Sequence, residues 1–155
     1  MKSKSEEETE ELIEKGGAYL ESEDYKEAKK SFEKAIKLDA KDSRGWIGLG
    51  RAYVKLKNNE EAKNCFKKAL ELDENNAKAW RSLGLAQRNI EEYDEAIKSY
   101  KKAIEIDKED VDTWIGLGRV YFDLKDYKSA KECLERVIEL DKENSNAWFN
   151  LGASI

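Results

Sequence analysis

Apolar residues follow a helical spacing in two successive stretches of the segment 43–76. In 43–57 the apolar positions fall at steps of three and four residues, and the stretch 60–72 shows the same spacing. Such steps place side chains on one face of an α-helix, so each stretch predicts an amphipathic helix. Asn58 and Asn59 lie between the two stretches and indicate a turn. The segment therefore predicts two helices joined by a short connection.

This two-helix pattern recurs along the chain with a period of 34 residues. Four series keep that step: Trp46, Trp80, Trp114 and Trp148; Gly16, Gly50, Gly84, Gly118 and Gly152; Ala28, Ala62, Ala96 and Ala130; and Asp39, Asp73, Asp107 and Asp141. Several series with one period indicate a repeat protein. Because one helix pair cannot bury its apolar stripe alone, we expect the pairs to stack.

The period divides the chain into an extension and one repeat domain. We expect an acidic N-terminal extension at 1–8, a single repeat domain at 9–155, units at 9–42, 43–76, 77–110 and 111–144, and a partial unit or capping helix at 145–155. The acidic run within 6–11 is a solvated start or favourable charge at a helix N-terminus, although it could also recruit a basic partner.

Candidate helix caps follow the same schedule. The residues that can cap the first helix of the next unit are Asp42, Asn76, Asp110 and Asn144. Before the second helices, three pairs resemble capping boxes and a fourth is a weaker copy: Asp24 with Glu27, Asn58 with Glu61, Glu92 with Glu95, and Asp126 with Ser129.

The periodic glycines lie inside predicted helices, where each costs about 1 kcal/mol relative to alanine. We expect a close approach of the two helices to offset this cost, with the periodic alanine of the second helix facing the glycine of the first. The paired glycines Gly48 with Gly50 and Gly116 with Gly118 are not a phosphate-binding loop, because a third glycine and a preceding strand are missing.

The repeated residues resemble the tetratricopeptide repeat (TPR) family. The second unit carries seven positions of the family pattern: Trp46, Leu49, Gly50, Tyr53, Ala62, Phe66 and Ala69. The resemblance covers 9–155 and implies an all-α fold of antiparallel helix pairs, stacked into a right-handed superhelical solenoid. It also implies that the first helices line a concave groove.

One departure from the family concerns proline, which the sequence lacks. The family usually places proline just after the second helix, where this chain has Ala40, Glu74, Lys108 and Lys142. We expect the helices to break there because Asp and Asn favour caps over continuation. The alternative is fusion of two helices at one junction, which would allow helix exchange between chains.

On the family pattern, the groove is lined by the second, fifth, ninth, twelfth and thirteenth residues of each unit. The candidate peptide-binding residues are Arg44, Ile47, Arg51, Val54, Lys55, Lys78, Arg81, Leu85, Arg88, Asn89, Ile115, Arg119 and Phe122. With Asp112 and Asp123 at the remaining positions, the lining has seven cations and two anions, a net of +5 in a chain with a net charge of −5. Unit one contributes Glu10, Ile13, Gly17, Leu20 and Glu21, an acidic end of the groove.

This lining predicts a non-catalytic protein–protein interaction scaffold that binds an extended acidic and apolar peptide. Arginine offers a planar fork that suits carboxylates, and exposed apolar residues beside it are typical of a binding surface. The family's clamp for a peptide C-terminus is not supported, because only Lys78 fits it. The alternative function is a self-assembling segment, a homo-oligomer formed through helix exchange or through 145–155, whose Trp148, Phe149 and Leu151 are apolar.

Composition excludes several other classes of function. The chain has no histidine, so it lacks the usual general base and the commonest metal ligand, and we expect no catalytic, metal or cofactor site. Its net negative charge argues against nucleic acid, and no apolar run reaches the length of a membrane span. We interpret Cys65 and Cys133 as small, buried, reduced residues, which fits a cytoplasmic protein.

Overall fold

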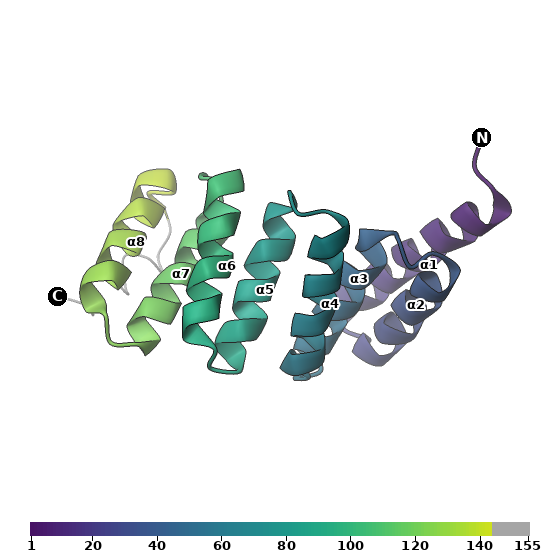
Figure 1. Ribbon diagram of the computed structural model, residues 1–155, viewed down its shortest axis with the longest axis horizontal. Helices are drawn as coiled ribbons and strands as arrows, with labels where there is room; N and C mark the ends of the chain where they lie inside the picture. The colour runs from purple at the N-terminus through teal and green to yellow at the C-terminus, as the bar shows by residue number, and fades with distance from the viewer. Residues whose placement is uncertain (144–155) are drawn as a thin grey trace.

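The computed structural model describes residues 1–143, which form α-helices and no strand (Figure 1). The helices are α1 (Lys4–Glu21), α2 (Tyr25–Leu38), α3 (Ser43–Lys55), α4 (Asn59–Leu72), α5 (Ala77–Asn89), α6 (Tyr93–Ile106), α7 (Val111–Asp123) and α8 (Tyr127–Leu140). The two helices predicted from 43–57 and 60–72 are α3 and α4. The turn between them lies around Lys57, which has a φ of 66°, and Asn59 already belongs to α4.

The helices pack as consecutive antiparallel hairpins. α1 packs on α2, α3 on α4, α5 on α6 and α7 on α8, and each hairpin also packs on the next one. Figure 1 shows the hairpins side by side in one row from the N-terminus to α8. This arrangement confirms the prediction of an all-α stack of helix pairs.

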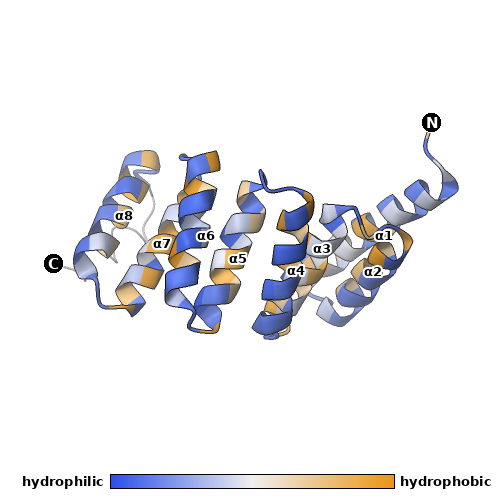
Figure 2. Ribbon diagram, viewed as in Figure 1, coloured by the Kyte–Doolittle hydropathy of each residue, from blue (hydrophilic) through white to orange (hydrophobic). Residues whose placement is uncertain are grey.

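Each second helix has a polar face on the outside of the stack and an apolar face that packs in the core. In Figure 2 the sides of α4, α6 and α8 that face the viewer are largely hydrophilic. The buried residues of α4, including Ala62, Phe66 and Leu70, cluster with Leu83 and Ala86 of α5. Each of the first three hairpins therefore completes its core with the first helix of the next hairpin, as expected for units that cannot fold singly.

An aromatic ring from each of α2, α4 and α6 fills the space beside the glycines. A Cβ atom added to Gly50 would lie 2.6 Å from the ring of Phe66, and one added to Gly84 would lie 2.9 Å from the ring of Tyr100. We expected the periodic alanine to face the glycine. In the first three hairpins the atoms nearest the glycine belong instead to the ring, and only at Gly118 is an alanine atom, the carbonyl oxygen of Ala130 at 3.8 Å, among the nearest. The glycines of the first three hairpins therefore make room for a bulky side chain.

In the last hairpin the aromatic residue is replaced by Leu134. A Cβ atom added to Gly118 would lie 3.3 Å from Cβ of Cys133 and 3.7 Å from Cδ2 of Leu134. These are looser contacts than those beside the rings, so the need for glycine is weaker in the fourth hairpin than in the second or third.

The periodic tryptophans join the core to the connections between hairpins. Trp46, Trp80 and Trp114 are half-buried and pack against the core clusters, and each indole N–H also donates a hydrogen bond to a backbone carbonyl. The three acceptors are the carbonyls of Ala40 at 2.9 Å, Glu74 at 2.8 Å and Lys108 at 2.8 Å. These acceptors occupy the positions where the family usually has proline.

The periodic aspartates end the second helices. The side chain of Asp39 accepts a hydrogen bond from the N–H of Lys41 at 3.0 Å. The equivalent bonds are Asp73 with Asn75, Asp107 with Glu109, and Asp141 with Glu143. Such Asx turns offer the backbone an alternative to helix continuation. The helices accordingly break at 39–42, 73–76 and 107–110, and none is fused across these junctions.

The predicted caps of the first helices are confirmed where the structure describes them. Asp42, Asn76 and Asp110 accept hydrogen bonds from the N–H groups of Arg44, Ala79 and Asp112, at distances of 3.0, 3.1 and 3.2 Å. The fourth candidate, Asn144, lies outside the described residues, as does the predicted partial unit 145–155.

The capping boxes predicted for α2, α4 and α6 were wrong. Asp24, Asn58 and Glu92 occupy the N-cap positions, but their side chains form no capping hydrogen bond. At the copy that looked weaker, Asp126 does form a side-chain cap: it accepts from the N–H of Ser129 at 3.2 Å and from its hydroxyl at 2.7 Å. The hydroxyl is an additional donor that Glu27 and Glu95 cannot offer to the acidic caps Asp24 and Glu92, because an ionised carboxylate has no proton to donate.

Helix α1 begins close to the N-terminus. Ser3 and Glu6 form a reciprocal capping box, in which the Glu6 N–H donates to Ser3 Oγ at 3.2 Å. The acidic residues of the first turn therefore lie where the helix dipole favours negative charge. The segment that the sequence sets apart as an extension is mostly helical and continues into the first hairpin. Within residues 1–143, no helix is both long and apolar enough to cross a membrane.

Candidate functional site

The first helices α3, α5 and α7 enclose an open hollow of about 480 Å³. Its lining comprises Arg51, Val54 and Lys55 of α3, Arg81, Ser82 and Leu85 of α5, Asp112, Ile115, Gly116 and Arg119 of α7, and Phe66 and Tyr100 from α4 and α6. This hollow is the candidate site, and we call it the central hollow.

The central hollow brings together seven of the thirteen candidate groove residues. They are Arg51, Val54, Lys55, Arg81, Leu85, Ile115 and Arg119. Along α3 the hollow uses the ninth, twelfth and thirteenth positions of the unit, whereas along α5 and α7 it uses mainly the fifth and ninth. It therefore crosses the helices obliquely, and a fixed set of positions per unit describes only part of it.

The other six candidates lie outside the central hollow, and three of them are engaged elsewhere. Ile47 is half-buried against the core cluster around Phe66. Asn89 donates a hydrogen bond to Asn59 at 3.0 Å. Phe122 is 44% exposed and packs edge to face on Tyr127, with ring centroids 5.3 Å apart. Of the remaining three, Lys78 is exposed, and Arg44 and Arg88 form ion pairs.

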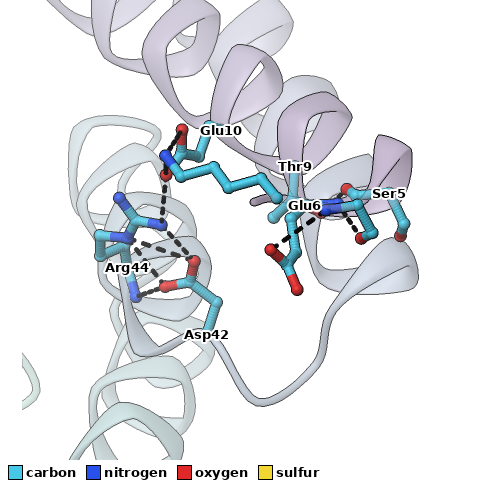
Figure 3. A network of polar contacts seen from close by, with 8 residues as sticks. Ser5, Glu6, Thr9, Glu10, Asp42 and Arg44 are labelled. Atoms are coloured by element: carbon cyan, nitrogen blue, oxygen red, sulfur yellow. Dashed lines mark hydrogen bonds and ion pairs between the residues drawn. The ribbon is translucent and has the colours of Figure 1, made fainter.

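Arg44 is held by acids at the junction of the first two hairpins (Figure 3). Its Nη2 lies 2.6 Å from Asp42 Oδ2 and 3.9 Å from Glu10 Oε1, and Lys2 also contacts Glu10. The hydrogen bond from Arg44 lowers the pKa of Asp42 below its ordinary value. The charge of Arg44 is therefore neutralised by acids of the protein itself, and one of them is Glu10 of the predicted acidic end of the groove.

Two arginines of α5 are paired with acids of the next hairpin. Arg81 Nη1 lies 2.7 Å from Asp110 Oδ2 and 3.6 Å from Asp112 Oδ2. Arg88 Nε lies 2.7 Å from Asp123 Oδ2, and this hydrogen bond raises the pKa of Arg88. The net charge of +5 given to the groove lining from the sequence therefore overstates the positive charge that a ligand would meet, because Asp110, the N-cap of α7, is not one of the groove positions.

Three cations of the central hollow have no acidic partner in the part of the chain that the structure describes. Arg51, Lys55 and Arg119 are exposed and form no ion pair within residues 1–143. They surround the apolar side chains Val54, Leu85 and Ile115. The available charge of the hollow is therefore positive, and it lies beside apolar surface.

The sequence analysis missed two aromatic residues of this site, Phe66 and Tyr100. Both belong to second helices, whereas the family pattern assigns the groove lining to first helices. Tyr100 packs between α5 and α7, because a Cβ atom on Gly84 or on Gly116 would lie 2.9 or 2.5 Å from its ring. Burial raises the pKa of Tyr100 to about 12. The sequence did carry a signal for Tyr100, because glycines at positions 84 and 116 leave space on α5 and α7 for an aromatic ring to reach the groove.

Both cysteines lie away from the central hollow. Cys65 and Cys133 are free and buried, as predicted. Burial raises the pKa of each thiol to about 12, so both are neutral near pH 7. A protonated, buried thiol is a poor nucleophile, and these residues act as small core side chains.

The fold of the chain is similar to that of many solved structures. Similar structures include PilF of Pseudomonas aeruginosa, with a TM-score of 0.89 and 21% identity, covering 98% of this chain and 69% of that one. MamA from Desulfovibrio magneticus RS-1 has a TM-score of 0.81 and 26% identity, covering 88% and 77%. YrrB, described as a TPR protein with an unusual peptide-binding site, has a TM-score of 0.77 and 23% identity, covering 92% and 74%.

The sequence comparison identifies the family directly. A comparison with curated proteins gives no significant match. The family model described as "Tetratricopeptide repeat" matches residues 19–87 and 91–155, which is most of the chain. The helix pairs, their 34-residue period and this match agree, and the right-handed solenoid predicted from the resemblance is confirmed. The chain belongs to the tetratricopeptide repeat family.

Proposed function

We propose that this protein is a non-catalytic scaffold whose central hollow binds an extended, acidic and partly apolar segment of a partner protein. The observation that carries the proposal is the placement of Arg51 and Arg119 around the apolar side chains of the hollow, where neither has an acidic partner among the described residues 1–143. The family supports the coarser statement, a protein–protein interaction scaffold.

The chemistry of the hollow selects against other ligands. A guanidinium without a partner recognises carboxylate in a planar, two-pronged geometry. Leu85 is 37% exposed in the hollow, and an apolar side chain left in water favours an apolar group on the ligand. A strongly anionic and uniformly polar ligand, such as nucleic acid, would leave this apolar surface uncovered. YrrB, whose structure is described as having an unusual peptide-binding site, is a peptide-binding precedent for this fold.

The binding test uses an array of 12-residue peptides in which aspartate, glutamate, leucine and phenylalanine are varied against a serine and glycine background. Fluorescence anisotropy then gives the dissociation constant of the tightest-binding array peptide. We expect Arg51→Glu with Arg119→Glu to abolish binding without unfolding the protein, since each charge reversal places an acid against the ligand's acids. Arg81 is left unchanged because its loss would also free Asp110, which caps α7.

The matched control is Lys41→Glu with Lys128→Glu, which changes the net charge by the same amount. Neither lysine lines the central hollow, and both are exposed. Binding that survives in the control and is lost in the arginine variant supports the proposal. Equal binding by both variants, or no array peptide bound by the unaltered protein, would overturn it.

Two further statements belong to the proposal. We place the protein in the cytoplasm, where its two free cysteines stay reduced. Self-assembly through residues 145–155 remains the alternative function named from the sequence, but that segment lies outside the described residues. Helix exchange through a fused helix gains no support from the junctions at 39–42, 73–76 and 107–110, all of which are broken.

A further inference from the structure

The hydroxyl of Tyr100 has no hydrogen-bond partner among residues 1–143. Tyr100 is only 2% exposed, yet it lines the central hollow. Among the described residues, no side-chain oxygen or nitrogen is both buried and without a hydrogen-bond partner, so the unpartnered Tyr100 hydroxyl must be in contact with solvent. What remains accessible of this side chain therefore opens onto the hollow. A buried polar group is normally paired, so a partnerless hydroxyl facing a hollow points to a ligand.

The hydroxyl is not needed for packing. Phe32 and Phe66 hold the same position in the first and second hairpins, each beside a glycine of its own first helix. Phenylalanine thus fills this place twice in the same chain. Only the third of these hairpins adds an oxygen. Its ring also meets Gly116 of the next first helix, as the Phe32 ring meets Gly48, and a Cβ atom added to Gly116 would lie 2.8 Å from the hydroxyl oxygen.

A free cation lies on the helix face beside this hydroxyl. Arg119 follows Gly116 by three residues in α7, so both project from the same side of the helix. Tyr100, Arg81 and Arg119 line the same hollow. Burial raises the pKa of Tyr100, and the positive charges of Arg88, Arg119 and Arg81 partly oppose that rise. Arg81 and Arg88 are paired with acids, whereas Arg119 forms no ion pair within the described chain.

We propose that the Tyr100 hydroxyl and the Arg119 guanidinium together receive one carboxylate of the bound peptide, above Gly116. The inference rests on the proposed function and adds to it the position of one acidic group. The tyrosine donates its O–H to one carboxylate oxygen, and the arginine donates N–H groups to the carboxylate from the side. A pKa of about 12 keeps the phenol protonated near pH 7, so it remains a donor. The carboxylate belongs to an acidic side chain or to the peptide C-terminus.

The test compares Tyr100→Phe with the unaltered protein, using the tightest array peptide described above as the anisotropy probe. Tyr100→Phe should weaken binding about tenfold or more, since hydrogen bonds to charged groups are among the strong ones. Its melting temperature should equal or exceed that of the unaltered protein, because phenylalanine already fills the equivalent place in two hairpins. Tyr93→Phe removes a hydroxyl from the same helix outside the hollow and should change neither value.

A second set of probes identifies the carboxylate. Each acid of the peptide is replaced in turn by its amide, and one probe carries an amidated C-terminus. One replacement should weaken binding to the unaltered protein about tenfold, but weaken binding to Tyr100→Phe and to Arg119→Gln far less, which is the coupling expected of groups in contact. That replacement shows whether the source is a side chain or the C-terminus.

The outcomes separate this inference from the proposed function. If Tyr100→Phe binds the probe as tightly as the unaltered protein, the carboxylate site is overturned. It is also overturned if Tyr100→Phe lowers the affinity by the same factor for every peptide, whether its acids are intact or replaced by amides. The scaffold proposal still stands in that case if Arg51→Glu with Arg119→Glu abolishes binding. If the arginine variant also binds normally, both are overturned.

Discussion

At the scale of single residues, the glycines and aromatic rings form matched pairs across the hairpins. Phe66 packs on Gly50, and Tyr100 packs on Gly84 and Gly116. The sequence predicted that these glycines compensate their cost to the helix through close packing, but not which side chain takes the space. Spacing along the chain shows which face a residue occupies; it does not show which residue of the neighbouring helix reaches that face.

Gly50→Ala should destabilise the protein by about 1–3 kcal/mol, because the new methyl group would lie 2.6 Å from the Phe66 ring in a packed core. Gly17→Ala is the matched control, since nothing lies within 4 Å of a Cβ atom at that position. Gly17→Ala should stabilise the protein by about 0.5–1 kcal/mol through helix propensity alone. Urea unfolding measures both changes, and shifts of the same sign in the two variants would contradict the packing assignment.

At the scale of the helices, an aspartate and a tryptophan side chain hold each junction where this family usually has proline. At the junction 73–76, Asp73 forms an Asx turn with Asn75, and Trp80 holds the carbonyl of Glu74. The sequence showed both series and predicted the breaks correctly. It did not show that the tryptophans bind the connections, because a hydrogen bond to a backbone carbonyl leaves no trace in the identity of the acceptor residue.

Glu74→Pro should stabilise the protein by about 0.4–1 kcal/mol by restricting the unfolded chain. The preceding residue, Asp73, already has the extended conformation that proline requires, with φ of −150° and ψ of 96°. The Trp80 bond uses the carbonyl of Glu74 and survives the change. Thermal unfolding measures the shift, and Lys68→Pro inside α4 is the control, expected to cost about 3 kcal/mol or more. A loss of stability in Glu74→Pro would show that the turn cannot accept proline.

At the scale of the whole molecule, stacking creates the site and also neutralises part of it. The period and the amphipathic stripes were sufficient to predict a stack of helix pairs, since they are local properties repeated along the chain, whereas the right-handed solenoid was implied by the family resemblance. The ion pairs of Arg81 with Asp110 and Arg88 with Asp123 join residues 29 and 35 positions apart. Such pairs depend on how one hairpin is offset from the next. Because this offset is not apparent in the sequence, the sequence could not show which cations are paired with acids and which are free.

The measurement that tests the central claim most directly is the salt dependence of peptide binding. The central claim is that the unpaired cations of the central hollow recognise acidic groups beside apolar ones. The unaltered protein should bind the tightest array peptide at least about tenfold more strongly than the same peptide with every acid changed to its amide. This preference should shrink as salt is raised, because the cations are exposed. Equal binding of the two peptides at low salt would contradict the account.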